Sequence, residues 1–311
     1  MRLFLRIICL FFLSAAQTFS EEISVMSFNL CNYFVEGDGQ PPIKPASSRE
    51  AIGKILGKIR PDIFIAIEIG GEKSYADFSK LLKENGCEYK FQKIMQGDDS
   101  SRHMALFSKF EPKEFHARND MKYKIKVKNS YYSDEIGVQR GILHSIFVFD
   151  GGYKLHLIGA HLKARVFHPR YNQTDMRRYE ARILRYIVNS ILEKEPDANV
   201  LVMGDFNDSF DSEPIRLLRD DKKENESRLY DLRPSDKWGM YWTHWWNQYD
   251  NYSRIDYALA SYSILPEIDH YKTQIIHIPE LWMFASDHRP ILIVLNTKNS
   301  KEIKKEELDL K

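Results

Sequence analysis

Polar side chains that can bind a metal ion or a phosphate recur where apolar runs of this sequence begin or end. Five such positions, in chain order, are Asn29, Glu68, His161, Asp205 and the pair Asp287-His288. A carboxylate that faces a cleft at the end of a strand costs free energy unless a cation or a proton balances its charge. The pattern therefore predicts one polar site that handles metal ions or phosphate.

The apolar runs themselves are short and bounded by turn residues, which is typical of buried strands. The expected strands are 23–29, 63–69, 104–108, 142–149, 155–161, 200–204, 255–260 and 291–295. Apolar residues at helical spacing predict helices over 48–59, 75–85 and 174–193. Gly151-Gly152 lies between two of the strands and predicts a hairpin.

Composition places the chain among ordinary globular proteins. Its 311 residues are 43% apolar and 13% aromatic with a formal net charge of +1, and Gly and Cys are few. Collagen, coiled-coil, solenoid and disulfide-dense folds are thereby excluded, and a mean hydropathy of −0.46 excludes a protein that spans the membrane many times. No Pro- or Gly-rich linker divides the chain, so we expect one domain of mixed strands and helices.

The two ends differ from the rest of the chain. Residues 1–20 combine Arg2 and Arg6 with a short apolar run and small residues, which predicts a cleaved signal peptide and a secreted or periplasmic protein. Its removal takes away two Arg and no acid, so the remaining chain is slightly acidic and any attraction to phosphate must be local. We expect a catalytic domain over 21–297 and a charged tail over 298–311. Export permits a disulfide between Cys31 and Cys87, but two buried thiols are an equal alternative.

Six motifs that contain the polar residues follow one another along the chain. They are SFNLCNY (27–33), PDIFIAIEIGG (61–71), GAHLKAR (159–165), VMGDFND (202–208), RIDYAL (254–259) and SDHRP (286–290). In this order they resemble the endonuclease/exonuclease/phosphatase superfamily, and most of all its secreted bacterial nuclease-type members. The resemblance implies an α/β fold: a four-layer sandwich of two packed mixed β-sheets flanked by helices, with a phosphoesterase active site at one end of the sheets.

The resemblance also implies roles for individual residues. Glu68 would bind the metal ion together with Asn29 and Asp287, and these hard oxygen ligands favour Mg²⁺ or Mn²⁺ over Zn²⁺. The residues that would act on water and phosphate are Asp205, which activates the water, Asn207, which helps to place it, and His288, Asp256 and His161, which stabilise the phosphate. Arg140 falls where members of the superfamily often place a polar group near the substrate.

Two features of the sequence bear on the substrate. A locally basic stretch supplies candidate phosphate contacts at Lys163, Arg165, Arg170 and Arg177, although part of it could be a solvated helix face. The segment WGMYWTHWW (238–246) includes Trp242, and its aromatic rings could stack on bases, insert at a lipid interface or pack in the core.

We therefore expect a metal-dependent hydrolase of phosphate esters whose substrate is DNA or RNA. Lipid head groups or small phosphate esters are the alternative substrates, and a non-catalytic phosphate-binding module is a further alternative. We expect a monomer with no protein partner and no membrane span in the mature chain.

Overall fold

A computed structural model describes residues 22–37, 42–219 and 227–297. Twelve of the strands in these residues form two six-stranded mixed sheets. The expected signal peptide and charged tail lie outside these residues. The order of the first sheet is β15 (Gln274–Ile275), β16 (Ile291–Asn296), β1 (Glu22–Tyr33), β2 (Ile63–Ile69), β4 (His103–Ser108) and β3 (Phe91–Met95). The order of the second sheet is β11 (Tyr230–Asp231), β14 (Asp256–Ala260), β10 (Asn199–Asp205), β9 (Lys154–His161), β8 (Ile142–Val148) and β5 (Glu114–Arg118).

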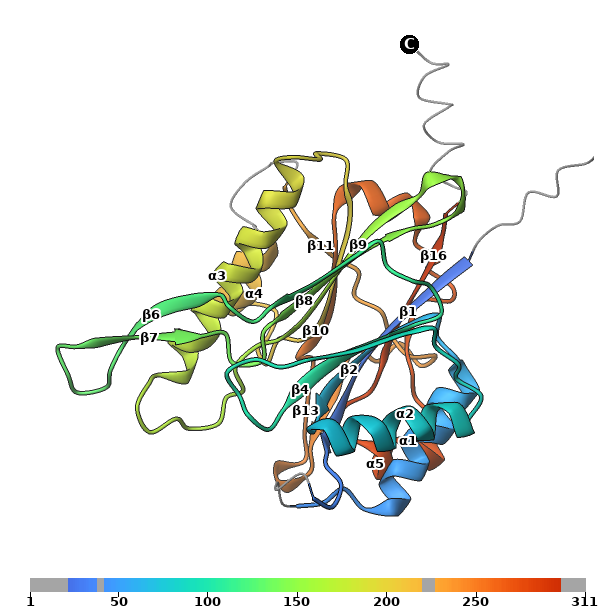
Figure 1. Ribbon diagram of the computed structural model, residues 1–311, viewed down its shortest axis with the longest axis horizontal. Helices are drawn as coiled ribbons and strands as arrows, with labels where there is room; N and C mark the ends of the chain where they lie inside the picture. Colours follow the sequence, from blue (N-terminus) through green and yellow to red (C-terminus); the bar gives the residue numbers. More distant parts are fainter. Residues whose placement is uncertain (1–21, 38–41, 220–226, 298–311) are drawn as a thin grey trace, which may run out of the picture.

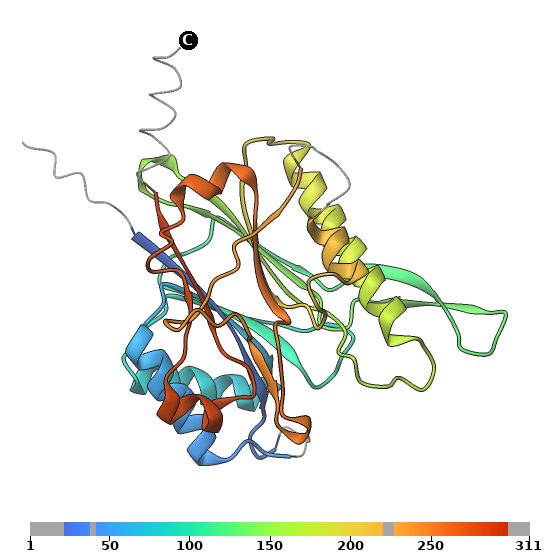
Figure 2. The ribbon, with the colours of Figure 1, turned by 180° about the vertical axis from the view of Figure 1, so that it is seen from behind.

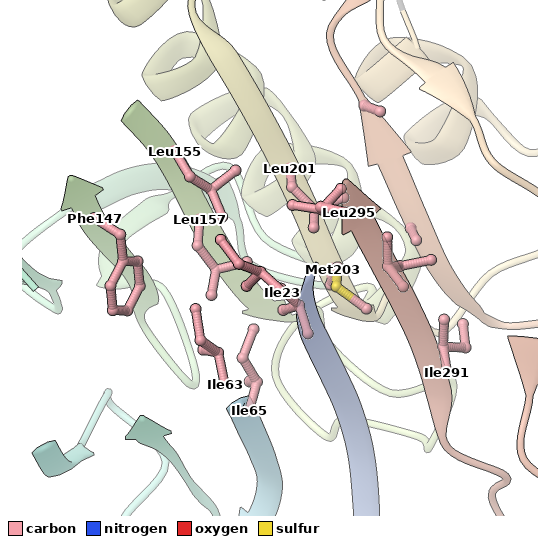
Figure 3. Close-up of a cluster of buried hydrophobic side chains, with 14 of the residues drawn as sticks. Ile23, Ile63, Ile65, Phe147, Leu155, Leu157, Leu201, Met203, Ile291 and Leu295 are labelled. Carbon is pink, nitrogen blue, oxygen red and sulfur yellow. The ribbon is translucent and has the colours of Figure 1, made fainter. Parts of the chain in front are cut away.

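The two sheets pack face to face, and helices cover their outer faces (Figures 1 and 2). Apolar side chains of both sheets meet between them, among them Ile23, Ile65, Leu157 and Leu201, as Figure 3 shows. On the first sheet lie α1 (Ala46–Ile59), α2 (Glu72–Glu84) and α5 (Pro279–Ala285), and on the second lie α3 (Gln173–Leu192) and α4 (Glu213–Arg219). This arrangement confirms the predicted four-layer α/β sandwich.

Alternation along the strands carries the polar residues into the space between the sheets. In β10, Leu201 and Met203 belong to the core between the sheets, and Asp205 is the next residue on the same face. Likewise Leu155 and Leu157 of β9 precede His161 on that face. His161 and Asp205 therefore continue the apolar rows of the inner core.

Strand direction brings these ends to one edge of the sandwich. β1 and β2 are parallel, and so are β9 and β10, so their carboxyl ends lie side by side. β14 is antiparallel to β10, and its first residue, Asp256, lies opposite Asp205. Chain segments far apart in sequence thus deliver their polar residues to one place.

The observed elements extend the sequence prediction. All eight expected strands are present. Seven agree with the expected bounds within one residue at each end, whereas β1 continues four residues further, to Tyr33. The predicted hairpin is confirmed, because β8 and β9 are antiparallel and joined by the 3₁₀ turn Asp150–Gly152. α1 and α2 begin two and three residues earlier than expected. The short helices α4 and α5 and two small hairpins were not predicted; the hairpins are β6 (Lys122–Lys126) with β7 (Ser133–Gly137) and β12 (His244–Trp246) with β13 (Asn251–Ser253).

The two cysteines within the described residues are free thiols. Cys87 is buried and its thiol donates to the carbonyl oxygen of Leu56 at 3.3 Å. Cys31 and Cys87 therefore form no disulfide with each other in this structure.

Candidate active site

The end of β1 is folded into an irregular turn that presents Asn29 and supports Glu68. Cys31 and Asn32 both adopt left-handed backbone conformations, with φ of 50° and 56°, and the pairing of β1 with β2 shifts register here. The backbone N–H of Asn32 donates to Glu68 Oε2 at 3.0 Å, and Glu68 itself has φ of 62°. Left-handed conformations are costly for residues other than glycine and gather at functional sites.

Asn29 links the two sheets. Its Nδ2 donates to Asp205 Oδ2 at 3.0 Å, and its Oδ1 accepts the N–H of Cys31 at 2.9 Å. The structure therefore places Asn29 as a partner of Asp205 while one lone pair of its Oδ1 is still available for a ligand.

Asp205 is buried and is held close to two histidines. Its Oδ2 lies 3.6 Å from His161 Nε2 and 3.8 Å from His288 Nε2. Burial, and then the nearby charge of Asp256, raise the pKa of Asp205 to about 7. Gly204 makes this position possible, since a Cβ there would lie 1.9 Å from the carbonyl oxygen of Ala160.

His288 and Asp256 form a buried pair. His288 Nδ1 lies 2.8 Å from Asp256 Oδ2, so this ring nitrogen donates to the carboxylate. Burial by itself lowers the pKa of His288, but the charges of Asp256 and Asp205 outweigh it and hold the pKa well above its usual value. The imidazolium is thus the stable form at neutral pH.

His161 has the opposite electrostatic character. Burial, and then the charges of Arg140 and His288, hold its pKa well below the usual range. Its Nε2 lies 3.7 Å from Glu68 Oε1, yet neither ring nitrogen has a hydrogen-bond partner in the part of the chain that the structure describes. A buried neutral imidazole without a partner, beside two carboxylates, indicates a place for a bound group.

Asn207 lies just beyond β10 in a left-handed conformation, with φ of 53°. Its backbone N–H donates to Asp205 Oδ1 at 2.9 Å, and its side-chain Nδ2 donates to the carbonyl oxygen of Leu162 at 3.0 Å. Asn207 therefore orients the Asp205 carboxylate.

Several carboxylates and imidazoles in this site suit a cation. Two groups of three side chains have ligand atoms within 4.8 Å of one another; they are His244, Asp287 and His288, and Asp205, Asp256 and His288. Asp287 of the predicted metal site belongs to the first of these groups. Buried acids packed together with an unpartnered imidazole are suited to a divalent ion.

His244 is a neighbour of Asp287 that sequence reasoning missed. Its Nε2 lies 3.7 Å from Asp287 Oδ2, and its backbone forms a bridge with His288. Although burial alone raises the pKa of Asp287, the nearby imidazole of His244 and the charge of His288 hold this pKa well below its usual range. The sequence gives no signal for His244, because it lies within the aromatic segment 238–246, where Trp and Tyr residues dominate the pattern.

Lys44 is a second residue that no motif identified. It is buried, and its Nζ donates to the carbonyl oxygen of Cys31 at 3.0 Å, inside the irregular turn at the end of β1. Burial lowers its pKa, against the opposing charges of Cys31, Asp287 and Glu68. Lys44 precedes a helix and belongs to no expected strand, so the strand-end pattern could not reveal it.

Two of the predicted substrate contacts lie beside the site. Arg140 is 4% exposed and its Nε lies 3.3 Å from Asp99 Oδ2. Lys163 is 8% exposed, and burial followed by the charge of Arg140 lowers its pKa.

The rest of the basic stretch does not form one phosphate-facing patch. Arg177 is buried, and its guanidinium bonds Asp208 at 2.7 Å and the carbonyl oxygen of Lys163 at 3.0 Å. Arg177, a predicted substrate contact, lies instead on the inward face of α3, where its guanidinium forms a buried ion pair. Arg165 also pairs with Asp208, from the exposed side.

Arg170 is exposed and lies beside the β6–β7 hairpin, where it pairs with Asp134 at 2.6 Å. Its side chain bonds Asp134 and Tyr171, and within the described residues it contacts neither Glu68 nor Asp205. The number of basic residues in this stretch of sequence is therefore larger than the number that is free to bind phosphate, because Arg165, Arg170 and Arg177 are paired with carboxylates.

The aromatic segment adjoins the site through its backbone. Trp245 N–H donates to the carbonyl oxygen of Asp287 at 2.9 Å. Trp242 is half-buried, with the guanidinium of Arg289 3.3 Å from its ring centre and the ring of Trp282 5.2 Å away. The exposed aromatic residues of this region are Trp238, Tyr241, Trp246, Tyr249, Tyr252 and Phe284.

Comparison with known proteins agrees with this fold. A family model described as "Endonuclease/Exonuclease/phosphatase family" matches residues 26–288, and the chain belongs to this family. Its members are phosphoric ester hydrolases that generally depend on divalent metal ions.

Solved structures show the same fold at low sequence identity. The chain is similar to humanized D. rerio TDP2 carrying 14 mutations (18% identity, TM-score 0.56, covering 88% of this chain and 99% of that one). It is similar to the human Nocturnin catalytic domain with a bound sulfate anion (16%, 0.58, 88% and 93%). It is also similar to an endonuclease/exonuclease/phosphatase family protein from Bacteroides thetaiotaomicron (16%, 0.55, 89% and 98%). A search of curated proteins finds no match.

Within the described residues, none of the helices has the length and apolar character needed to cross a bilayer.

Proposed function

We propose that this protein is an exported, divalent-metal-dependent nuclease that hydrolyses phosphodiester bonds of DNA or RNA. The observation that carries the proposal is the position of Asp205, which lies between Asn29 of the other sheet, the His288–Asp256 pair and the unpartnered His161. This arrangement offers a base, a buried cation and a neutral hydrogen-bond donor around one point. The expected signal peptide supports export.

Glu68 and Asp287, with Asn29, are the residues that would hold Mg²⁺ or Mn²⁺. Carboxylate and amide oxygens are the ligands that these hard ions prefer. When bound, the ion withdraws electron density from a phosphate oxygen and neutralises charge that develops on the reacting group.

Asp205 accepts the proton of the attacking water. Asn29 and Asn207 fix its two oxygens by hydrogen bonds, so the carboxylate keeps one orientation. With a pKa of about 7 it is a competent base near neutral pH, since a general base is most effective when its pKa is close to the working pH.

His288 and His161 bind the phosphate in different protonation states. His288 is cationic, and Asp256 fixes its ring through Nδ1 and leaves Nε2–H to face the reacting group. His161 is neutral and donates one N–H to a phosphate oxygen. Fixed donors of this kind stabilise a transition state whose negative charge grows.

Nucleic acid is favoured as the substrate by the buried cations Arg140 and Lys163 beside the site and by exposed aromatic rings near Asp287. Cations bind backbone phosphates, and exposed rings stack on unpaired bases. The same rings, Trp246 and Phe284 among them, favour a second candidate, a lipid head-group phosphodiesterase whose aromatic side chains enter the bilayer interface.

A substrate panel tests the proposal. The mature chain, residues 21–311, is incubated with Mg²⁺ or Mn²⁺ and plasmid DNA, RNA, sphingomyelin vesicles or a small phosphate monoester. The Asp205→Asn variant, purified identically, controls for contaminating nucleases. We expect cleavage of DNA or RNA that the variant lacks. Hydrolysis of sphingomyelin alone would support the second candidate, and equal activity of the variant would refute the assigned chemistry.

A further inference from the structure

Two loops from different sheets are joined at the edge of the candidate active site. Residues 96–102 connect β3 to β4 of the first sheet, and residues 138–141 connect β7 to β8 of the second. The N–H of Asp99 donates to the carbonyl oxygen of Gln139 at 2.6 Å, and the N–H of Gly137 donates to Asp98 Oδ2 at 2.7 Å. At Gly97 a Cβ would lie 2.5 Å from the backbone of Arg140, so the loops are in direct contact.

Each loop ends next to a residue of the site. β4 begins with His103 opposite Ile69, so Arg102 lies beside the strand end that carries Glu68. β8 begins with Ile142 opposite Ala160, so Arg140 lies beside the strand end that carries His161.

The loops bring Arg102 and Arg140 to the same carboxylate. Asp99 Oδ2 lies 3.3 Å from Arg140 Nε and 4.0 Å from an Nη of Arg102. One carboxylate cannot satisfy both guanidinium groups, and Arg140 Nη1 is buried without a hydrogen-bond partner among the described residues. Arg102 also donates from Nε to Asn32 Oδ1 at 2.7 Å, and its side chain is 35% exposed.

Lys163, two residues beyond the end of β9, is the third cation of the group. Buried Glu180 of α3 accepts the backbone N–H groups of both Gln139 and Lys163, at 3.0 and 2.6 Å. One carboxylate thereby fixes the two segments that carry Arg140 and Lys163. The charges of Arg102, Arg140 and Lys163 all act on His161, so all three cations lie near this residue.

This group lies beside the reacting centre and not in it. Arg102 reaches Glu68 only through Asn32, and Arg140 contacts Asp99 instead of Glu68 or Asp205. The reacting phosphate has His288 and His161 as its own donors. An anion held by the three cations must therefore be a second group on the substrate.

We propose that Arg102, Arg140 and Lys163 form a second phosphate subsite, which binds a phosphate group adjacent to the one that is hydrolysed. Guanidinium groups bind phosphate oxygens by paired, charge-assisted hydrogen bonds. The substrate class is then a phosphodiester with a neighbouring phosphate, either the next link of a nucleotide chain or a terminal phosphate. The inference rests on the proposed function and names the feature of the substrate that the site selects.

The test compares phosphodiesters that differ only in neighbouring phosphates. TpT has one phosphate, pTpT and TpTp add a terminal phosphate on either side, and TpTpT adds an internal link. The quantity measured is the ratio of kcat/KM for each longer substrate to that for TpT. It is determined for the wild type, for Arg102→Met and for the control Arg216→Met, whose side chain is exposed on α4.

We expect the wild type to prefer at least one substrate with a neighbouring phosphate by about tenfold, the size of one charge-assisted hydrogen bond. This ratio should fall to near one in Arg102→Met and keep its wild-type value in Arg216→Met. Preference for pTpT or TpTp but not TpTpT assigns the subsite to a terminal phosphate, and preference for TpTpT assigns it to a chain.

A wild-type ratio near one, or the same ratio in Arg102→Met as in the wild type, would overturn the proposal, because Arg102 would then act only through Asn32. If the wild type hydrolyses none of these compounds, the proposed function fails and binding decides the subsite. In chelator, calorimetry should then show thymidine 3′,5′-bisphosphate binding about tenfold more tightly than thymidine 5′-monophosphate in the wild type but not in Arg102→Met. Equal affinities would refute the subsite independently.

Discussion

A buried histidine pair far from the candidate active site predicts how this protein responds to acid. His144 of β8 is 5% exposed, and its Nε2 lies 3.2 Å from Nδ1 of His156 on β9. Burial, and to a smaller extent the neighbouring cationic groups, lowers the pKa of His144 to about 3. The basic groups that face the pair are His116, Arg118 and Lys154. The acidic groups that face it are Glu114 and Glu195.

The sign of the effect follows from linkage. The unfolded chain takes up a proton on this histidine near pH 6.5, whereas the folded chain does so only near pH 3. The unfolded state therefore binds more protons between these values, and the free energy of unfolding falls as the pH falls from 6.5 toward 3. Integrating this difference from pH 7.5 to pH 4 gives a loss of about 3 kcal/mol from His144 alone.

The substitution His144→Gln tests this reasoning. The Gln amide can still donate to His156 but cannot titrate, so the loss of stability between pH 7.5 and pH 4 should shrink by about 3 kcal/mol. Urea unfolding at several pH values, followed by tryptophan fluorescence, measures it. His270→Gln, which changes an exposed histidine, is the matched control. The reasoning is refuted if His144→Gln loses as much stability in acid as the wild type does.

Three further predictions concern the candidate site. Excess chelator should abolish hydrolysis and added Mg²⁺ or Mn²⁺ should restore it; full activity in chelator contradicts the metal assignment. Replacing Asp205 by Asn or His288 by Ala should lower kcat by about a hundredfold or more while circular dichroism stays unchanged, and a loss below tenfold in a folded variant would show that the chemistry lies elsewhere. Arg177→Met should cost about 2 kcal/mol of unfolding free energy in urea, because Asp208 loses its buried partner and keeps only the exposed Arg165; unchanged stability would mean that the ion pair is not structural.

The sequence by itself determined the fold class and the residues at the strand ends. Alternation of apolar residues is a local property of a strand, so the runs that end at Asn29, His161 and Asp205 could be recognised without any tertiary contact. The recurrence of polar residues at the ends of these runs also predicted one shared site. The parallel pairing of β1 with β2 and of β9 with β10, which the structure shows, explains why these ends meet at one edge.

Only the tertiary structure decided which charged residues are free to bind a substrate. Arg177 and Arg165 look alike in sequence, yet one is buried and the other exposed on the same Asp208 carboxylate. The pairing of charges depends on contacts between residues far apart in the chain, and these contacts cannot be predicted from the composition.

The same reason explains the residues that sequence reasoning missed. Lys44, Arg102 and His244 lie in loops or short strands without periodicity, and each becomes part of the site through a partner at least 13 positions away. A loop has no repeating pattern that fixes where its side chains point. Their positions are set by the packing of the two sheets and by the loops that cross between them, and that packing exists only in the folded chain.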